Sequence, residues 1–404
     1  MVTSAREWKE VQLGDVTHEL TGSIVPLASP DSVFTEYSMP AYDAGRKPVR
    51  VPGSSMLSAR RIITSPCVLV NKLNVRKRRV WIVPQPANNA VSSFEFVPLA
   101  SSELDLEYLR NLALSNDFTE HLESSTSGTS NSQKRVTAED IFSFQFLMPQ
   151  FPEQRAIAEV LSGFDEHLAN LDELIAKKKS IRDGALDAMF SGKKRMRGFQ
   201  NPFLRTKLLE YSEVLTGLTY NPADVQTSGV LVLRSSNIQD DVISLEDTVF
   251  VRASAATSPS VQAGDVLLCV RNGSTRLIGK TAQISEDVPR GTAFGAFMAI
   301  LRALPAIDPS YLYWFTKSSA FREQVREVLG ATIYQITKRD LAYFTISIPE
   351  SIAEQKAIAE VLSSMDEEIR VLQAERLKVG VLKLGAMDDL LTGRVRLPVE
   401  EVDA

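Results

Sequence analysis

The chain contains a long basic window without a single carboxylate. From Ala44 to Phe94 no Asp or Glu occurs, although 50 acidic residues among 404 would place about six there. Cations without neighbouring acids suit a phosphate backbone, because each neutralised phosphate releases condensed counterions. Arginine and asparagine also match the hydrogen-bonding edges of guanine and adenine. The window's ten cations are Arg46, Lys47, Arg50, Arg60, Arg61, Lys72, Arg76, Lys77, Arg78 and Arg79. The candidate nucleic-acid contacts among them, with Asn74, are Arg46, Lys47, Lys72, Arg76, Lys77, Arg78 and Arg79. A solvated basic loop is the alternative.

Two polar segments could add further contacts. Residues 124–135 read SSTSGTSNSQKR, and residues 330–339, GATIYQITKR, hold the corresponding place later in the chain. Hydroxyl, amide and backbone N–H groups commonly contact phosphates and bases. We therefore predict a shared role in binding, with an ordinary connector as the alternative. The candidates here are Gln133, Lys134, Arg135, Tyr334, Gln335 and Lys338.

Residues 273–281, GSTRLIGKT, resemble a nucleotide-binding phosphate loop but fail its requirements. Five residues separate Gly273 from Gly279 where that loop needs four, and the following TAQI predicts a strand instead of a helix. We expect a turn that faces a polyanion. The candidate contacts in this half of the chain are Arg234, Asn237, Arg271, Asn272, Ser274, Arg276 and Lys280.

Composition argues against several other classes of protein. The net charge of −5 excludes a globally basic nucleic-acid coat. Cys67 and Cys269 lie too far apart in sequence for a CxxC zinc site, and three scattered histidines make imidazole-based metal catalysis improbable. No apolar stretch is long enough for a transmembrane span, and the first residues lack the apolar core of a signal peptide. We also find no signature of a catalytic triad or of a methyltransferase.

An internal repeat organises the chain. Residues 153–162 read EQRAIAEVLS and residues 354–363 read EQKAIAEVLS, at an offset of 201. Over 153–196 and 354–397, 18 of 44 positions are identical. Weaker anchors precede each copy, with a Thr…Asp…Pro pattern after 136 and 336, and Leu-Thr-Gly at 20–22 and 215–217. The plan is a variable domain, a helix, a second variable domain and a second helix.

Each repeat predicts a long helix with an a/d heptad seam. Residues 153–190 would form a helix about 57 Å long. Pro152 and Glu153 suit its first turn, and Gly192 and Gly393 suit C-terminal caps. Gly184 and Gly385 inside the seam indicate either a close helix crossing or a local break. The seam residues are Ile157, Leu161, Phe164, Leu168, Leu171 and Ile175, and then Ile358, Leu362, Met365, Ile369 and Leu372; Arg376 replaces Ile175 in the second copy.

The two seams are expected to pair with each other as an antiparallel coiled coil, related by a pseudo-twofold axis. The alternative is that each seam packs on its own variable domain. The variable domains read as mixed α/β (α+β), with short strands at 66–73, 79–83, 230–234, 265–271 and 281–284. Helical segments are expected at 104–122 and 308–329. The predicted domains are 1–150, 151–197, 198–350 and 351–404.

The arrangement resembles the specificity (S) subunit of type I restriction-modification systems. The resemblance covers essentially the whole chain and rests on the two "EQ.AIAEVLS…D" helices, on LTG near each domain start, on GDVLL at 264–268 and on the Thr…Asp…Pro anchors. The first domain lacks a clear GDVLL strand, and SPCVLV at 65–70 is its expected equivalent.

The resemblance implies a function without catalysis in this chain. Each target-recognition domain would read one half of a split double-stranded DNA sequence, and the coiled coil would set the spacer. Two methyltransferase (M) subunits that bind S-adenosylmethionine, and restriction (R) subunits that use ATP and magnesium, would be the partners. The setting would be the cytoplasm of a bacterium or archaeon. The alternatives are a partner that fuses restriction and methylation in one polypeptide, and a coiled-coil scaffold that binds only proteins.

Overall fold

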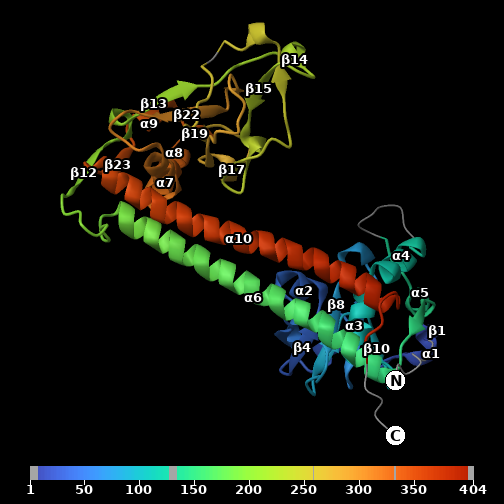
Figure 1. Ribbon diagram of the computed structural model, residues 1–404. Coiled ribbons are helices and arrows are strands. Elements are labelled where there is room, and N and C mark those ends of the chain that lie inside the picture. Colours follow the sequence, from blue (N-terminus) through green and yellow to red (C-terminus); the bar gives the residue numbers. More distant parts are fainter. Residues whose placement is uncertain (1–7, 127–133, 258, 332–333, 399–404) are drawn as a thin grey trace. The chain divides into compact units, whose positions relative to one another are not determined.

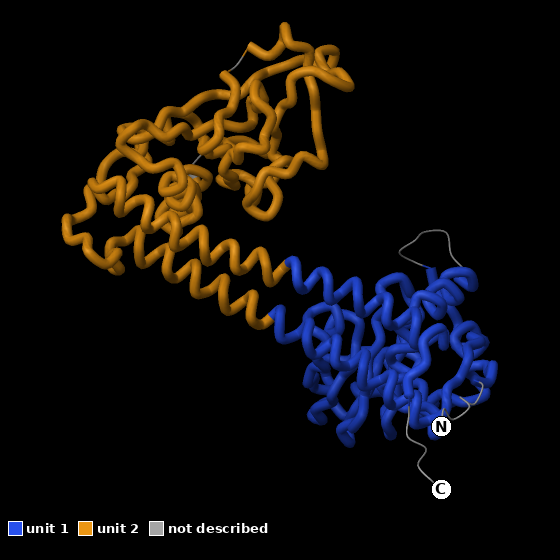
Figure 2. Tube along the Cα trace, viewed as in Figure 1, with its two compact units in different colours: residues 1–172, 374–404 blue, residues 173–373 orange. Residues whose placement is uncertain are grey.

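The computed structural model describes residues 8–126, 134–257, 259–331 and 334–398 (Figure 1). The chain forms two compact units (Figure 2). Unit 1 comprises residues 1–172 and 374–404, and unit 2 comprises residues 173–373. Each unit therefore contains one variable domain and one segment of each long helix, whereas the predicted boundaries treat the helices as separate segments.

Unit 1 contains a four-stranded sheet of order β2-β10-β7-β8 in which all neighbours are antiparallel. All five side chains of β7 are buried, which fits a short β-branched strand in the middle of a sheet. A five-stranded sheet of order β3-β6-β9-β4-β5 and a β1-β11 pair complete the strands. The strands are β1 (Lys9–Gln12), β2 (His18–Glu19), β3 (Ser23–Ile24), β4 (Val33–Tyr37), β5 (Val49–Pro52), β6 (Arg60–Ile62), β7 (Cys67–Asn71), β8 (Val80–Val83), β9 (Ala90–Ser92), β10 (Phe96–Ala100) and β11 (Gln145–Met148).

Unit 2 repeats this frame. Its sheet of order β13-β22-β19-β20 matches β2-β10-β7-β8, and the β12-β23 pair matches β1-β11. Strand β19 contains the VLLC of GDVLLC, so SPCVLV of β7 is its equivalent as predicted. The strands are β12 (Phe203–Lys207), β13 (Ser212–Thr216), β14 (Val225–Gln226), β15 (Val230–Leu233), β16 (Ile238–Gln239), β17 (Val242–Ile243), β18 (Phe250–Val251), β19 (Val266–Cys269), β20 (Thr281–Gln283), β21 (Ala293–Phe294), β22 (Met298–Ala303) and β23 (Thr345–Pro349).

Each predicted helical segment of the variable domains is a pair of helices. Ser115 and Ser318 break the segments because both adopt extended backbone, and the Ser115 hydroxyl caps the next helix. Thr137 and Thr337 each form a capping box with an Asp three residues later. The helices are α1 (Leu13–Val16), α2 (Met39–Gly45), α3 (Leu106–Leu114), α4 (Asn116–Ser124), α5 (Ala138–Phe142), α7 (Pro309–Lys317), α8 (Ser319–Ala331) and α9 (Lys338–Leu341).

The two repeat segments form helices of 40 residues, α6 (Phe151–Phe190) and α10 (Ile352–Leu391). Within each unit they run antiparallel. Unit 1 pairs Asp165 with Lys383 at 2.5 Å, and unit 2 pairs Lys178 with Glu368 at 2.5 Å. The antiparallel pairing of the two helices is thus confirmed inside both units.

The seam is buried for most of its length. Phe164, Leu168, Met365 and Leu372 are half-buried, and Ile157, Leu161, Leu171, Ile175, Ile358, Leu362 and Ile369 are buried. Arg376, which replaces Ile175, binds Asp172 across the helices, and Val379 beyond it is buried again. The second seam therefore continues past Leu372.

At the start of α6, the seam also packs on its own domain. Ile157 and Leu161 share one hydrophobic cluster with Tyr108 and Leu112 of α3 and with Met387 of α10. Ile358 and Leu362 take the same position in unit 2. The two packing alternatives therefore both occur, at different heptads.

The Glu-Gln dipeptide at the start of each repeat joins the long helix to its variable domain. The Gln154 side chain accepts a hydrogen bond from the Asp105 N–H and donates to the carbonyls of Glu103 and Pro149. Gln355 makes the same set of bonds to Asp308, Ala306 and Pro349. Both glutamines are buried, so each ties its long helix to the start of α3 or of α7 in its own unit.

The preceding glutamate binds the end of the opposite helix segment. Glu153 pairs with Arg396 at 2.7 Å, and Glu354 pairs with Arg195 at 2.9 Å. The chain reaches each arginine after a left-handed turn at Gly393 or Gly192, with φ of 73° and 71°, which confirms both glycines as C-terminal caps.

The expectation for the two internal glycines was wrong. Gly184 and Gly385 lie in unbroken helix, and a Cβ added at either would meet no atom within 4 Å. Neither a close crossing nor a break explains them, and nothing in the structure gives them a role.

Candidate nucleic-acid interface

The basic window centres on the loop that joins β7 to β8. Strands β7 and β8 form an antiparallel hairpin, and its loop contains the single 3-10 turn Val75–Lys77. Asn74 and Arg78 flank this turn with positive φ of 53° and 43°. Val75 is buried among the residues of α3 and α4, which fixes the loop and leaves Arg76 and Lys77 exposed.

The window lacks acids in sequence but not in space. Arg60 binds Glu36, Arg61 binds Glu19, Arg76 binds Glu123 and Arg79 binds Asp43, with distances between 2.5 and 2.7 Å. Hydrogen bonding to Arg79 lowers the pKa of Asp43 below its usual value. Four of the ten cations are thus neutralised by carboxylates that lie outside the window.

Two of the predicted contacts in the window serve the fold. Arg79 is buried and both of its bonds to Asp43 are internal, so its assignment as a DNA contact is corrected. Arg78 donates to the Leu114 carbonyl and to the Asn116 side chain, across the break between α3 and α4. Among the described residues, Arg46, Lys47, Lys72 and Lys77 form no ion pair and remain candidates.

The first polar segment meets the hairpin loop. Gln133 lies outside the described residues. The Lys134 carbonyl accepts from the Asn74 N–H, and Arg135 forms a β-bridge with Leu73 and an ion pair with Glu95. In unit 2, Gln335 forms the corresponding bridge with Arg271. The two polar segments therefore hold equivalent places, as their sequence positions predict.

The corresponding loop of unit 2 joins β19 to β20. Arg271 is exposed and lies over the ring of Phe297, itself 54% exposed, at 5.2 Å. Asn272 accepts from the Ser274 N–H and donates to Ser235. Arg276 is exposed in the turn Thr275–Leu277, and Lys280 donates to the Ile238 carbonyl. The segment leads into strand β20, so it lacks the helix that a nucleotide-binding loop requires.

The remaining predicted contacts of unit 2 differ in exposure. Asn237 is fully buried, and its amide bonds internally to Ser244, Asp247 and the Arg234 N–H, so its assignment as a DNA contact is corrected. Arg234 is half-buried and pairs with Asp247. Tyr334, with φ of 51°, and Lys338 are exposed and remain candidates, and Gln335 is half-buried.

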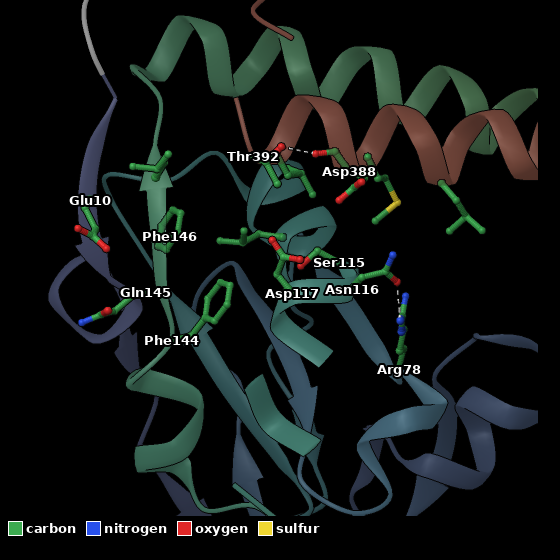
Figure 3. Close-up of a pocket in the computed structure, with 15 residues that line it drawn as sticks. Glu10, Arg78, Ser115, Asn116, Asp117, Phe144, Gln145, Phe146, Asp388 and Thr392 are labelled. Atoms are coloured by element: carbon green, nitrogen blue, oxygen red, sulfur yellow. Dashed lines mark hydrogen bonds between the residues drawn. The ribbon is translucent and has the colours of Figure 1, made fainter. Parts of the chain in front are cut away.

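A cavity of about 240 Å³ in unit 1 has the opposite charge character (Figure 3). It lies between the α3–α4 junction, β11 and the end of α10. Its lining includes the carboxylates of Glu10, Asp117 and Asp388, while Arg78 donates its hydrogen bonds to Leu114 and Asn116. A surplus of carboxylates repels phosphate, so this cavity does not belong to the candidate interface.

The two cysteine thiols and the potential metal ligands of this chain form no reactive site among the described residues. Burial raises the pKa of Cys67 to about 12 and that of Cys269 to about 11, so both thiols are protonated at neutral pH. In the described part of the chain, no group of three metal-ligating side chains gathers. Nor does any described helix have the length and apolarity to cross a membrane.

Comparisons with known proteins agree with this geometry. Residues 261–379 match the family of type I restriction modification DNA specificity domains. The specificity subunit of the type I enzyme StySPI from Salmonella potsdam is 32% identical over 38% of this chain and 34% of its own length. That of MjaVIII from Methanocaldococcus jannaschii is 25% identical over 72% and 71%. Over these ranges the chain is similar to type I specificity subunits.

Solved structures share the fold of this chain. A chain from a structural study of assembly and conformational transition of the type I system has a TM-score of 0.64 at 19% identity, covering 96% of this chain and 98% of that one. The S subunit from M. genitalium has a TM-score of 0.59 at 15% identity, covering 97% and 98%. The chain spans about a third of the length of the Salmonella relative, and 29% of the EcoKI specificity subunit from Escherichia coli.

Two exposed cations and one half-buried cation that the predicted set omits lie on α7 and α8. Arg322 and Arg326 lie four residues apart on α8, and Lys317 ends α7. The signal was present in SAFREQVREVLG, where buried Phe321 and Val325 alternate with exposed Arg322 and Arg326 at helical spacing. These side chains lie beside the β19–β20 loop, since Arg276, Arg322 and Arg326 line one cavity.

Proposed function

We propose that this chain is the non-catalytic, sequence-specific DNA-binding subunit of a type I restriction-modification complex. The observation that carries the proposal is the repeated frame with two divergent hairpin loops. Each unit presents exposed cations from the same loop of the same sheet, Lys77 in unit 1 and Arg271 and Arg276 in unit 2. Two similar heads with different loops suit a split target whose halves differ in sequence.

The proposal assigns the chemistry to partner subunits. Two methyltransferase subunits with S-adenosylmethionine would methylate adenine, and restriction subunits with ATP and magnesium would cleave unmodified DNA. A stripe on α10 supports docking of a partner helix. Leu377, Val381 and Leu384 are 68%, 69% and 52% exposed, and their spacing of four and three places them on one helix face. A partner that fuses restriction and methylation in one polypeptide would use the same face.

Sequencing the methylome of a bacterial host tests the proposal. The host would express this chain together with a methyltransferase subunit of its system, beside a host that lacks this chain. We expect a split, adenine-methylated motif that depends on this chain. If the complex assembles and no such motif appears, the DNA-reading role is wrong and a protein-binding scaffold takes its place.

The coiled coil is the proposed ruler for the spacer. Inserting one heptad after Asp172 and one after Gln373 keeps the seam in register and adds about 10 Å of helix. We expect the unspecified spacer of the motif to lengthen by about three base pairs, at 3.4 Å per pair. An unchanged spacer, with methylation retained, would mean that the helices do not measure it.

A further inference from the structure

The hairpin loop and its neighbouring helix enclose a cavity in both units, and the two cavities differ. In unit 1 the cavity between the β7–β8 loop and α4 measures only about 10 Å³. The ion pair between Arg76 and Glu123 lies on its lining. A space of this size barely holds one water molecule. Unit 1 is therefore closed at this point.

In unit 2 the corresponding cavity is open. It lies between the β19–β20 loop, α7 and α8 and measures about 360 Å³. Helices α4 and α8 start in the same way, because the hydroxyls of Ser115 and Ser318 each accept from the N–H of the phenylalanine three residues later. Counted from these serines, Arg326 holds the position on α8 that Glu123 holds on α4. A cation thus replaces the carboxylate that closes unit 1. The loop arginine Arg276 has no acidic partner on this helix.

The lining of the unit 2 cavity is strongly cationic. It contains one carboxylate, Asp241, against the five cations Arg276, Lys280, Lys317, Arg322 and Arg326. Lys317 binds Asp241 at 2.8 Å and Lys280 binds a carbonyl. Arg276 and Arg322 make no side-chain hydrogen bond or ion pair with the residues that the structure describes. Arg326 donates from Nε to the Arg322 carbonyl at 3.4 Å and pairs loosely with Glu323 at 3.8 Å, which leaves most of its N–H groups free. Three guanidinium groups are therefore available to a ligand.

We propose that this cavity is a phosphate-binding site of unit 2 that unit 1 lacks. Guanidinium groups bind phosphate oxygens through paired hydrogen bonds, and a concave site with one sign of charge concentrates the potential. Arg322 and Arg326, one helical turn apart, would hold the phosphate from α8, and Arg276 would hold it from the loop. The phosphate fits a phosphodiester of bound DNA, in which case the inference rests on the proposed function. A free phosphate compound has the same chemistry.

The protonation of Lys317 would respond to an anion bound in the cavity. Burial lowers its pKa from the usual value, while Asp241 opposes that shift. A bound phosphate would favour the charged form of Lys317, because it adds negative charge beside a poorly solvated amine. Anion binding would therefore strengthen the cationic character of the site.

Salt-dependent DNA binding tests the site in the complete complex with methyltransferase subunits. A duplex carrying the methylome motif would be titrated at 50 and 200 mM salt for wild type and for the double variant Arg322→Ala/Arg326→Ala. Loss of one phosphate contact lowers the salt slope by about 0.9. The affinity advantage of wild type should therefore shrink about 3.5-fold over this fourfold change in salt. Arg326→Glu, which installs the carboxylate of unit 1, should act in the same direction.

Two further measurements separate the outcomes. Arg290→Ala removes an exposed cation of unit 2 outside the cavity and serves as the control, with an unchanged slope expected; it matches the single variant Arg322→Ala in charge. Calorimetric titration with inorganic pyrophosphate tests the second source of phosphate.

If the double variant loses pyrophosphate binding while its DNA salt slope stays unchanged, the cavity binds a free phosphate compound. If neither the slope nor pyrophosphate binding changes, the site is refuted. If wild type shows no preference for the motif, the proposed function fails, and the pyrophosphate titration still tests the cavity.

Discussion

Units 1 and 2 share their frame and differ at the hairpin loop. The same sheet order, the same capping boxes and the same glutamine contacts occur in both. In unit 1 the loop closes on α4 through Arg76 and Glu123, whereas in unit 2 it leaves a cationic cavity beside α8. The positions that attach each domain to the long helices are preserved, while the positions that could touch a ligand diverge. Attachment and recognition are therefore carried by different residues of the same domain.

The largest expected effect on stability comes from removing the buried glutamine that ties each long helix to its domain. Gln154→Ala and Gln355→Ala would each leave one buried N–H and two carbonyls without their partner, and we expect each to lower the free energy of unfolding by about 3 kcal/mol. Urea unfolding followed by tryptophan fluorescence measures this, with Trp8 and Trp81 in unit 1 and Trp314 in unit 2. Gln262→Ala, at an exposed position, is the control. A much larger cost in one unit than in the other would contradict an equivalent role.

A second comparison concerns the glycine of the two Leu-Thr-Gly motifs. A Cβ at Gly217 would lie 2.1 Å from the Gly295 carbonyl oxygen, whereas a Cβ at Gly22 would meet the Ile62 side chain at an ordinary 3.5 Å. We expect Gly217→Ala to cost about 2 kcal/mol through overpacking, and Gly22→Ala to cost well below that. Thermal unfolding of the two variants checks the ranking, and equal costs would show that the motif has one purpose in both units.

Opening the cavity of unit 1 should produce a smaller effect. Glu123→Ala removes the carboxylate that holds Arg76 and leaves that guanidinium free. We expect the salt slope of DNA binding to rise by up to about 0.9, because one more cation can meet a phosphate. The matched variant Glu120→Ala removes an exposed acid from the same helix without releasing an ion pair. Equal slopes for the two variants would mean that Arg76 lies away from the DNA.

The smallest expected effect is a change in acid stability at the helix ends. Burial alone would raise the pKa of Glu153, but hydrogen bonds from Arg396 and Trp8 outweigh it, so the pKa lies below the usual value. A lowered pKa in the folded state stabilises the protein above the unfolded pKa, near 4.3, and this stabilisation is lost as pH falls through the folded pKa. Glu153→Gln should therefore lose less stability than wild type between pH 5 and 3. Parallel pH profiles of the free energy of unfolding would refute this.

Much of the frame could be predicted from the sequence because it depends on local patterns. The heptad seams predict α6 and α10, and short β-branched runs predict β7, β8, β15, β19 and β20. The breaks at Ser115 and Ser318 also had a local signal, since serine is a common N-cap. Patterns of this kind depend on residues that are neighbours along the chain, so they can be recognised without knowledge of the fold.

Which cations are paired with acids and which are free to bind a ligand could not be predicted from local patterns. Arg76 and Glu123 are 47 residues apart, and Arg79 and Asp43 are 36 apart, so only the fold brings the charges together. Asn237 resembles a base-reading residue in sequence, but its amide closes a turn in the interior. A count of acids along the chain says little about acids in space.

The arrangement of unit 1 has a consequence for biosynthesis. Unit 2 is one continuous segment, whereas unit 1 joins the first 172 residues to residues 374–404, and Met387, Leu390 and Leu391 belong to its hydrophobic cluster. A ribosome needs about 10 to 40 s for the roughly 200 intervening residues at about 5 to 20 residues per second. During that time the first domain to be translated waits with its cluster incomplete. The order of completion is thus the reverse of the order of synthesis, with unit 2 able to finish before unit 1.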